Sequence, residues 1–123
     1  MSTWGAHLKN CGEVIAEMTA IGLGLKKNAL LEKIINGEFH LAPPGIDLSK
    51  THLGQVITSF HRDFDLLTIH GKARYSGLYA WLNTGEKFLV KVPNNHFLVQ
   101  GGKQLEWLTG GYIKAGFHEV IHN

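Results

Sequence analysis

The sequence contains a single cysteine, Cys11, among its 123 residues. One thiol excludes an internal disulfide and a multi-cysteine metal cluster, and it favours a reducing compartment, so we predict a cytoplasmic location. No apolar run approaches the ~20 residues that a membrane-spanning helix requires. The N-terminus also lacks the basic start and apolar core of a signal peptide. We therefore expect no membrane association.

Charge of one sign is also scarce, with 12 basic against 10 acidic side chains and a formal net charge of +2. The densest basic cluster is Lys26-Lys27, so we expect no nucleic-acid partner. Hydrophobic residues make up 44% of the chain and charged residues 18%, which is typical of a globular domain with one core. Histidine is plentiful, with eight residues, and this number justifies a search for metal-ligand spacing.

The first third of the chain shows helical periodicity. Apolar side chains recur at steps of four and three, which predicts one helix with a packing stripe. The stripe consists of Trp4, Leu8, Cys11, Ile15 and Met18. Ser2 and Thr3 are candidate N-caps, while Gly22 and Gly24 are candidate stops. A second, shorter helix is expected from Asn28 to a stop at Gly37.

From residue 38 onward the apolar period changes to two, and Pro43-Pro44 predicts an extended segment. Short strands separated by turn signals favour a sandwich or barrel. The expected strands are 54–60, 66–71, 77–83, 87–92, 96–100 and 112–117, and the expected reversals are 83–86, 93–95 and 110–111. The sequence thus predicts one mainly β domain in which a helical support, residues 1–36, packs on an antiparallel jelly-roll core, residues 37–123.

The triplet His61-Arg62-Asp63 is the most specific local feature. In an extended segment, residues two apart share a face, so His61 and Asp63 can converge on one ion while Arg62 points away. A second imidazole from a distant strand would complete the two-His, one-carboxylate set of non-haem Fe(II) oxygenases. The same donors can bind zinc, although no His-Glu-x-x-His helix is present. Ser59 lies in no Gly-x-Ser-x-Gly elbow, so a serine hydrolase is not supported.

Short motifs across nearly the whole chain resemble, in the correct order, the isopenicillin N synthase-like branch of the 2-oxoglutarate/Fe(II) dioxygenases. These motifs are Gly22-Leu23-Gly24-Leu25, His61-Arg62-Asp63 with Leu67-Thr68, Gly77-Leu78, Val92-Pro93, Val99-Gln100-Gly101-Gly102, Leu105-Glu106, Thr109-Gly110-Gly111 and Phe117-His118-Glu119-Val120. His118 stands where the family places its second metal-binding histidine.

The resemblance implies a double-stranded β-helix in which His61, Asp63 and His118 hold Fe(II). It also implies 2-oxoglutarate as co-substrate, together with O2 and a small organic substrate that is hydroxylated or oxidised. The chain is accordingly expected to be the catalytic-core portion of such an oxidoreductase.

Departures from the family pattern weaken one part of this expectation. Ala42 stands where the family has a tyrosine that helps to hold 2-oxoglutarate, and Lys103 replaces an aspartate. The family's Arg-x-Ser motif for the distal carboxylate would fall beyond Asn123, so we expect a chain truncated at the C-terminus that binds 2-oxoglutarate weakly or not at all. Lys103 or Arg74 could contact an anion instead. The alternative is a non-catalytic jelly roll that binds a metal or a partner. His70, near the end of its strand, could line the pocket, but surface exposure is favoured, and His40 is open in the same way. The other histidines are interpreted as solvent-facing: His7, His52, His96 and His122.

Overall fold

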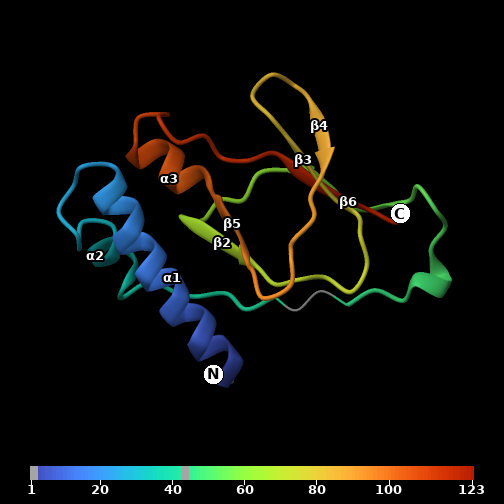
Figure 1. The fold of residues 1–123 in the computed structure, drawn as a ribbon, viewed down its shortest axis with the longest axis horizontal. Coiled ribbons are helices and arrows are strands. Elements are labelled where there is room, and N and C mark those ends of the chain that lie inside the picture. The colour runs from blue at the N-terminus through green and yellow to red at the C-terminus, as the bar shows by residue number, and fades with distance from the viewer. Residues whose placement is uncertain (1–2, 43–44) are drawn as a thin grey trace. The chain divides into compact units, whose positions relative to one another are not determined.

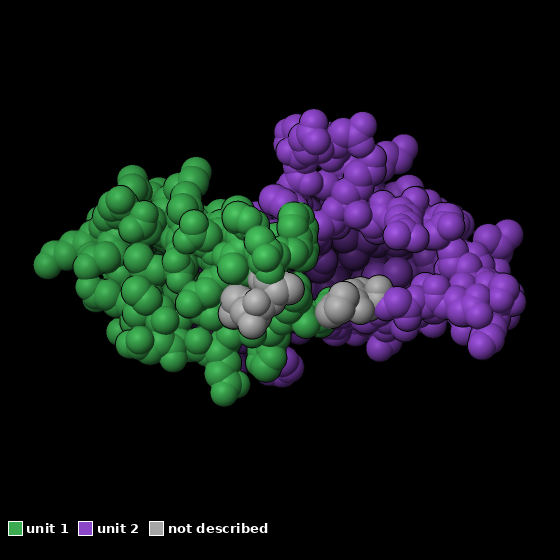
Figure 2. Space-filling model, turned by 90° about the horizontal axis from the view of Figure 1, so that it is seen from below, with its two compact units in different colours: residues 1–44 green, residues 45–123 purple. Residues whose placement is uncertain are grey.

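The computed structural model describes residues 3–42 and 45–123. It divides into two compact units, residues 1–44 and residues 45–123, which Figure 2 shows in green and purple. The expected single domain, with the helices packed on the β core, stays a prediction. The expected cap at Ser2 and the extended exit at Pro43-Pro44 lie outside the described residues.

Unit 1 contains helix α1, Thr3–Gly22, and the single-turn helix α2, Leu31–Ile34. The predicted stop of α1 is confirmed. Gly24 has a φ of +72°, and the N–H of Leu25 donates to the carbonyl of Ala20 at 2.9 Å. A left-handed residue after the last turn lets the chain reverse and satisfies a free carbonyl at the helix end. The second helix is shorter than expected, and Gly37 follows it as predicted.

The predicted packing stripe of α1 is confirmed in part, because Leu8, Cys11 and Ile15 are half-buried. Trp4 and Met18 are 55% and 64% exposed, whereas Ala16 and Ala20 are fully buried. Leu30, which lies just before α2, is also buried at 4% exposure. Small alanine side chains allow a second segment to approach the helix closely, so the contact face is set by volume as well as by hydrophobicity.

Unit 2 holds two antiparallel sheets, which Figure 1 shows together with their connections. One sheet has the strand order β1-β6-β3-β4, and the other pairs β2 with β5. The strands are β1 Val56–His61, β2 Leu67–His70, β3 Leu78–Trp81, β4 Lys87–Leu89, β5 Leu98–Gly101 and β6 His118–Ile121. A short 3-10 helix, Leu48–Lys50, precedes β1, and helix α3, Lys103–Leu108, follows β5. This confirms antiparallel β structure for this part of the chain.

Five of the expected strands overlap observed ones, and the hairpin of β3 and β4 turns within the predicted residues 83–86. Gly85 has a φ of +87°, and the N–H of Leu82 donates to the carbonyl of Glu86 at 2.9 Å. A type of turn that requires positive φ favours glycine.

The sixth expected strand, 112–117, is wrong, because the strand begins only at His118. Helix α3, which was not predicted, occupies the preceding segment, and Gly110 and Gly111 reverse the chain with φ values of +59° and +84°. Residues 112–117 are then needed to return the chain to the sheet. There the N–H of Ala115 donates to a carboxylate oxygen of Glu106 in α3 at 2.8 Å, instead of to a strand.

The most buried apolar residues of unit 2 lie in α3 and shortly before strands β2 and β6. Leu66, Leu105 and Ala115 are at most 5% exposed, and the buried polar residue beside them is His118, at 4%. In the part of the chain that the structure describes, no helix combines the length and apolar character needed to cross a membrane.

Candidate metal centre

His61 and His118 are brought together by strand pairing. His61 ends β1, His118 begins β6, and the two residues are Cα partners in the antiparallel ladder. Their ring centroids lie 4.1 Å apart. Asp63 follows β1 by two residues, and its Oδ1 lies 3.4 Å from His61 Nε2 and 3.7 Å from His118 Nε2. Two neighbouring residues, His61 and Asp63, and the distant His118 thus aim one donor atom each at a common point.

This donor set fits a divalent ion. One ligand atom from each of the three residues lies within 4.8 Å of the others, and among the described residues this is the group of three that could hold a metal. Two ligands about 2.1 Å from an ion and at right angles to each other lie roughly 3.0 Å apart. The observed separations of 3.4 and 3.7 Å therefore require a small contraction and no change of fold.

The two imidazoles are oriented by the backbone behind them. His61 Nδ1 donates to the carbonyl of Ser59 at 2.7 Å, and His118 Nδ1 lies 3.3 Å from the carbonyl of Gly116 and 3.2 Å from the Gln100 amide nitrogen. In His61, a proton on Nδ1 leaves a lone pair on Nε2, the nitrogen that faces Asp63. Metal-binding histidines in proteins are commonly held by such a hydrogen bond from the second ring nitrogen.

Asp63 is held by two side chains from the other sheet. Its Oδ2 accepts hydrogen bonds from the Thr68 hydroxyl and from the Gln100 amide, both at 2.6 Å, which leaves Oδ1 turned toward the imidazoles. Burial by itself would raise the pKa of Asp63, but these hydrogen bonds and the two nearby imidazoles outweigh it, so the pKa is lowered. The carboxylate is therefore ionised and ready to act as a ligand at neutral pH.

The backbone around Asp63 is anchored by the first turn of α3. The N–H of Lys103 donates to the carbonyl of Asp63 at 2.8 Å, and the N–H of Gln104 donates to that of Asp65 at 3.1 Å. The N–H of Gly102 donates to Leu66 at 3.1 Å. The first N–H groups of a helix lack partners within the helix, so α3 uses them to fix the loop that carries the aspartate.

Gly102 makes this close approach feasible. A Cβ at this position would lie 2.2 Å from the carbonyl oxygen and 2.4 Å from Oδ1 of Asp65. Any larger residue must displace either the loop or the helix.

The interpretation of His70 as a surface residue is wrong. His70 lies on β2 two residues after Thr68, so both side chains share the face of the strand that meets the candidate centre. Its ring sits edge-on to that of His118, with centroids 5.8 Å apart, and its Nε2 is buried. Burial lowers the pKa of His70, and the neighbouring His118 lowers it further, so the neutral imidazole is favoured.

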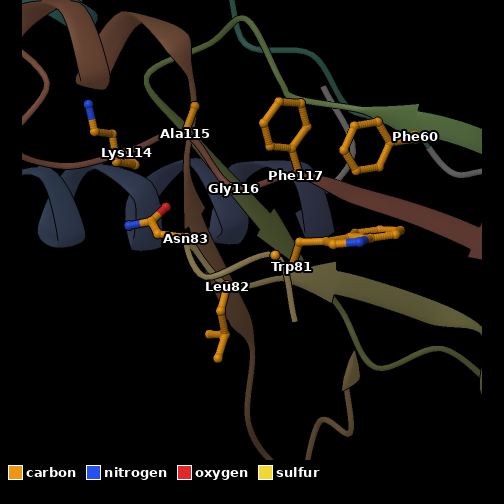
Figure 3. A pocket seen from close by; sticks show the side chains of 9 residues that line it. Phe60, Trp81, Leu82, Asn83, Lys114, Ala115, Gly116 and Phe117 are labelled. Carbon is orange, nitrogen blue, oxygen red and sulfur yellow. The ribbon is translucent and has the colours of Figure 1, made fainter. Parts of the chain in front are cut away.

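Arg62 points away from the centre, as predicted. Its guanidinium lies 4.3 Å from the ring centroid of Phe117 and 3.4 Å from a Glu106 oxygen. On the same side, Phe60 stacks on Phe117 with centroids 4.5 Å apart and meets Trp81 edge-on at 4.6 Å. Figure 3 shows these rings and the backbone beside them lining a pocket. None of the three candidate ligands lines it.

Neither cation considered as an anion contact points at the centre. The Lys103 ammonium lies 3.9 Å from a Glu106 oxygen and 5.6 Å from the Trp107 ring centroid. Arg74 is exposed in the connection between β2 and β3.

Sequence reasoning missed the outer residues Thr68 and Gln100, and it favoured the surface over the pocket for His70. Thr68 and Gln100 are Cα partners on β2 and β5, and nothing in the sequence pairs these two strands. The available signal was the alternation along β2, which puts His70 on the face that Thr68 occupies.

No protein-family model matches the chain. The curated gibberellin 2-beta-dioxygenase 1 of Arabidopsis thaliana is 26% identical over 119 residues, which are 89% of this chain and 36% of the relative. The chain thus spans about a third of the length of the curated relative that it matches.

Solved structures agree with this likeness. JOX2, in a complex with 2OG, Fe, and JA, is 24% identical with a TM-score of 0.74, over 98% of this chain and 36% of JOX2. A C-terminally truncated T7H of Neurospora crassa is 16% identical with a TM-score of 0.76, over 97% of this chain and 44% of T7H. Full-length T7H has been solved with alpha-KG, with 17% identity, a TM-score of 0.72 and coverage of 98% of this chain and 38% of T7H. The chain is thus similar in sequence to a curated dioxygenase, and it shares the fold of the matching parts of JOX2 and T7H.

Proposed function

We propose that this chain carries the metal centre of a non-haem Fe(II)- and 2-oxoglutarate-dependent oxygenase that hydroxylates or oxidises a small organic substrate. His61, Asp63 and His118 would hold the iron, and residues 45–123 would form the jelly-roll core around it. The observation that carries this proposal is the convergence of His61 Nε2, Asp63 Oδ1 and His118 Nε2. We also propose a cytoplasmic location, on the basis of the single cysteine.

The contacts that orient the three donor side chains favour a metal site over a chance cluster of polar residues. Each imidazole is held by a backbone carbonyl, and the aspartate is held through its second oxygen. Two neutral imidazoles and one carboxylate on one side of an ion leave the opposite positions open, and this facial arrangement is the one that Fe(II) oxygenases use. When bound, iron supplies the sites at which a 2-oxoacid and O2 react.

The chain's own residues orient the metal ligands and exclude water from the site. The carbonyls of Ser59 and Gly116 orient the two imidazole rings, and Thr68 and Gln100 hold Asp63 in one rotamer. The low exposure of His118, 4%, keeps water from one side of the site. A pre-arranged site from which water is partly excluded favours oxidation of the substrate over side reactions with solvent.

Anaerobic titration with Fe(II) tests the ligand assignment. Asp63→Ala should weaken binding by about a hundredfold or more, because a charged ligand is lost and two facing imidazoles alone hold Fe(II) poorly. Asp47→Ala is the matched control, since Asp47 is an exposed carboxylate that contacts Ser49 in unit 2. Equal Fe(II) affinity in Asp63→Ala and the parent chain, with the fold retained by circular dichroism, would exclude the assignment.

Addition of 2-oxoglutarate to the Fe(II)-loaded chain separates the oxygenase from the alternative, a non-catalytic metal-binding jelly roll. Chelation of Fe(II) by a 2-oxoacid gives a visible charge-transfer absorption. A saturable band supports the oxygenase, and iron binding without any band supports the alternative.

A further inference from the structure

A buried polar atom beside the candidate centre lacks a partner. Among the residues that the structure describes, His70 Nε2 is the buried side-chain nitrogen or oxygen for which no hydrogen bond is found. A buried donor or acceptor without a partner costs free energy, and native proteins rarely keep one unless it serves a purpose. The position of this atom indicates what that purpose is.

His70 lies on the inner face of the β2–β5 ladder. Thr68 on β2 and Gln100 on β5 share this face, since both donate to Asp63. His70 is two residues beyond Thr68, and its ring meets His118 edge-on at 5.8 Å between centroids. The unpartnered atom is thus next to the metal-binding residues, although His70 is not part of the group of three that converges on one point.

We propose that His70 is a ligand-binding residue of this site, which hydrogen-bonds through Nε2 to an oxygen of the 2-oxoacid held at the metal. This inference rests on the proposed function. Carboxylate and keto oxygens are acceptors without a proton, and an imidazole N–H is a matched donor for them. In this arrangement Thr68 and Gln100 orient the aspartate, and His70 is the side chain of the same face whose Nε2 has no hydrogen-bond partner.

Three variants separate ligand binding from a structural role. His70→Leu removes both ring nitrogens at similar volume, whereas His70→Gln places an amide N–H near the position of Nε2. His96→Leu is the control, because His96 is exposed in unit 2 and contacts the carbonyl of Asn94. Fe(II) affinity, 2-oxoglutarate affinity from the charge-transfer band, and thermal stability without metal are measured for each protein.

The expected result for His70→Leu has three parts. 2-Oxoglutarate binding weakens by about tenfold or more, which corresponds to the loss of one hydrogen bond to a charged acceptor. Fe(II) affinity stays unchanged, because His70 is not a metal ligand. The metal-free protein is at least as stable as the parent, because a buried atom without a partner has been replaced by an apolar one. His70→Gln restores part of the 2-oxoglutarate affinity, and His96→Leu changes none of the three quantities.

Several outcomes would overturn the inference. Unchanged 2-oxoglutarate affinity in His70→Leu, or a parent chain that binds Fe(II) but gives no saturable response to 2-oxoglutarate, would do so. A loss of Fe(II) affinity in His70→Leu would instead identify His70 as a metal ligand. If the parent chain does not bind Fe(II) at all, the proposed function fails, and this inference falls with it. Pyruvate, which lacks the distal carboxylate, locates the contact: equal weakening for both acids places His70 at the chelating end, and weakening for 2-oxoglutarate alone places it at the distal end.

Discussion

The close packing of Gly102 against the Asp65 loop predicts that Gly102→Ala disturbs the metal centre from outside it. The added Cβ would lie 2.2 Å from the Asp65 carbonyl oxygen, which is far inside van der Waals contact. The obstacle is backbone, so no rotation of a side chain relieves it. The loop or α3 must shift, and the hydrogen bonds from Lys103 and Gln104 to Asp63 and Asp65 are strained or lost.

The expected magnitude follows from these contacts. Overpacking of this kind costs about 1–3 kcal/mol, and two weakened backbone hydrogen bonds add about 0.5–1.5 kcal/mol each. We expect Gly102→Ala to lower the free energy of unfolding by about 2–6 kcal/mol. Fe(II) affinity should fall by roughly ten- to a hundredfold, the range found when groups behind metal ligands are removed.

Urea unfolding and anaerobic Fe(II) titration measure the two effects. Gly71→Ala is the matched control, because a Cβ at Gly71 meets nothing within 4 Å. Comparable stability and metal affinity in Gly102→Ala and Gly71→Ala would refute the reasoning, since the α3 contact would then not hold the Asp63 loop.

The remaining predictions concern one carboxylate, one amide and one glycine. The N–H of Ala115 donates to the Glu106 carboxylate and lowers the pKa of Glu106 below its usual value of 4.5. The ionised carboxylate therefore stabilises the folded state fully above pH 4.5, and this stabilisation is lost as the pH falls through the lowered pKa. Between about pH 6 and 3, the free energy of unfolding of Glu106→Gln should therefore depend less on pH than that of the parent chain. Identical pH dependence of the two free energies would contradict this. Gln100→Leu should weaken Fe(II) binding by roughly tenfold, because Asp63 loses a donor, whereas Gln100→Glu should weaken it further through charge repulsion; an unchanged titration would exclude the role. Gly77→Ala should lower the melting temperature, because Gly77 has a φ of +141° and a Cβ there would lie 2.2 Å from a carbonyl of β6; Gly71→Ala is again the control.

Much of the local structure was predictable because short-range rules dominate it. The stop of α1 at Gly24 and the hairpin turn at Gly85 need positive φ, which glycine adopts without strain. The alternation of Leu67, Thr68 and Ile69 predicts a strand whatever its partner is. Helix α3 escaped prediction because it is only six residues long, too short for a periodic apolar pattern, and because its first turn is stabilised by carbonyls of a distant loop.

The same distinction between local and long-range determinants applies to the candidate site. The sequence by itself determined which residues offer metal-binding donors and that His61 and Asp63 share a face, because side-chain direction along an extended segment depends only on spacing. Only the tertiary structure decided that His118 is the Cα partner of His61, that Gln100 reaches Asp63 and that His70 is turned inward. The physical reason is that these contacts depend on which strands pair and in which register. Pairing is set by burial and hydrogen bonding summed over the whole of unit 2, so no single segment contains it.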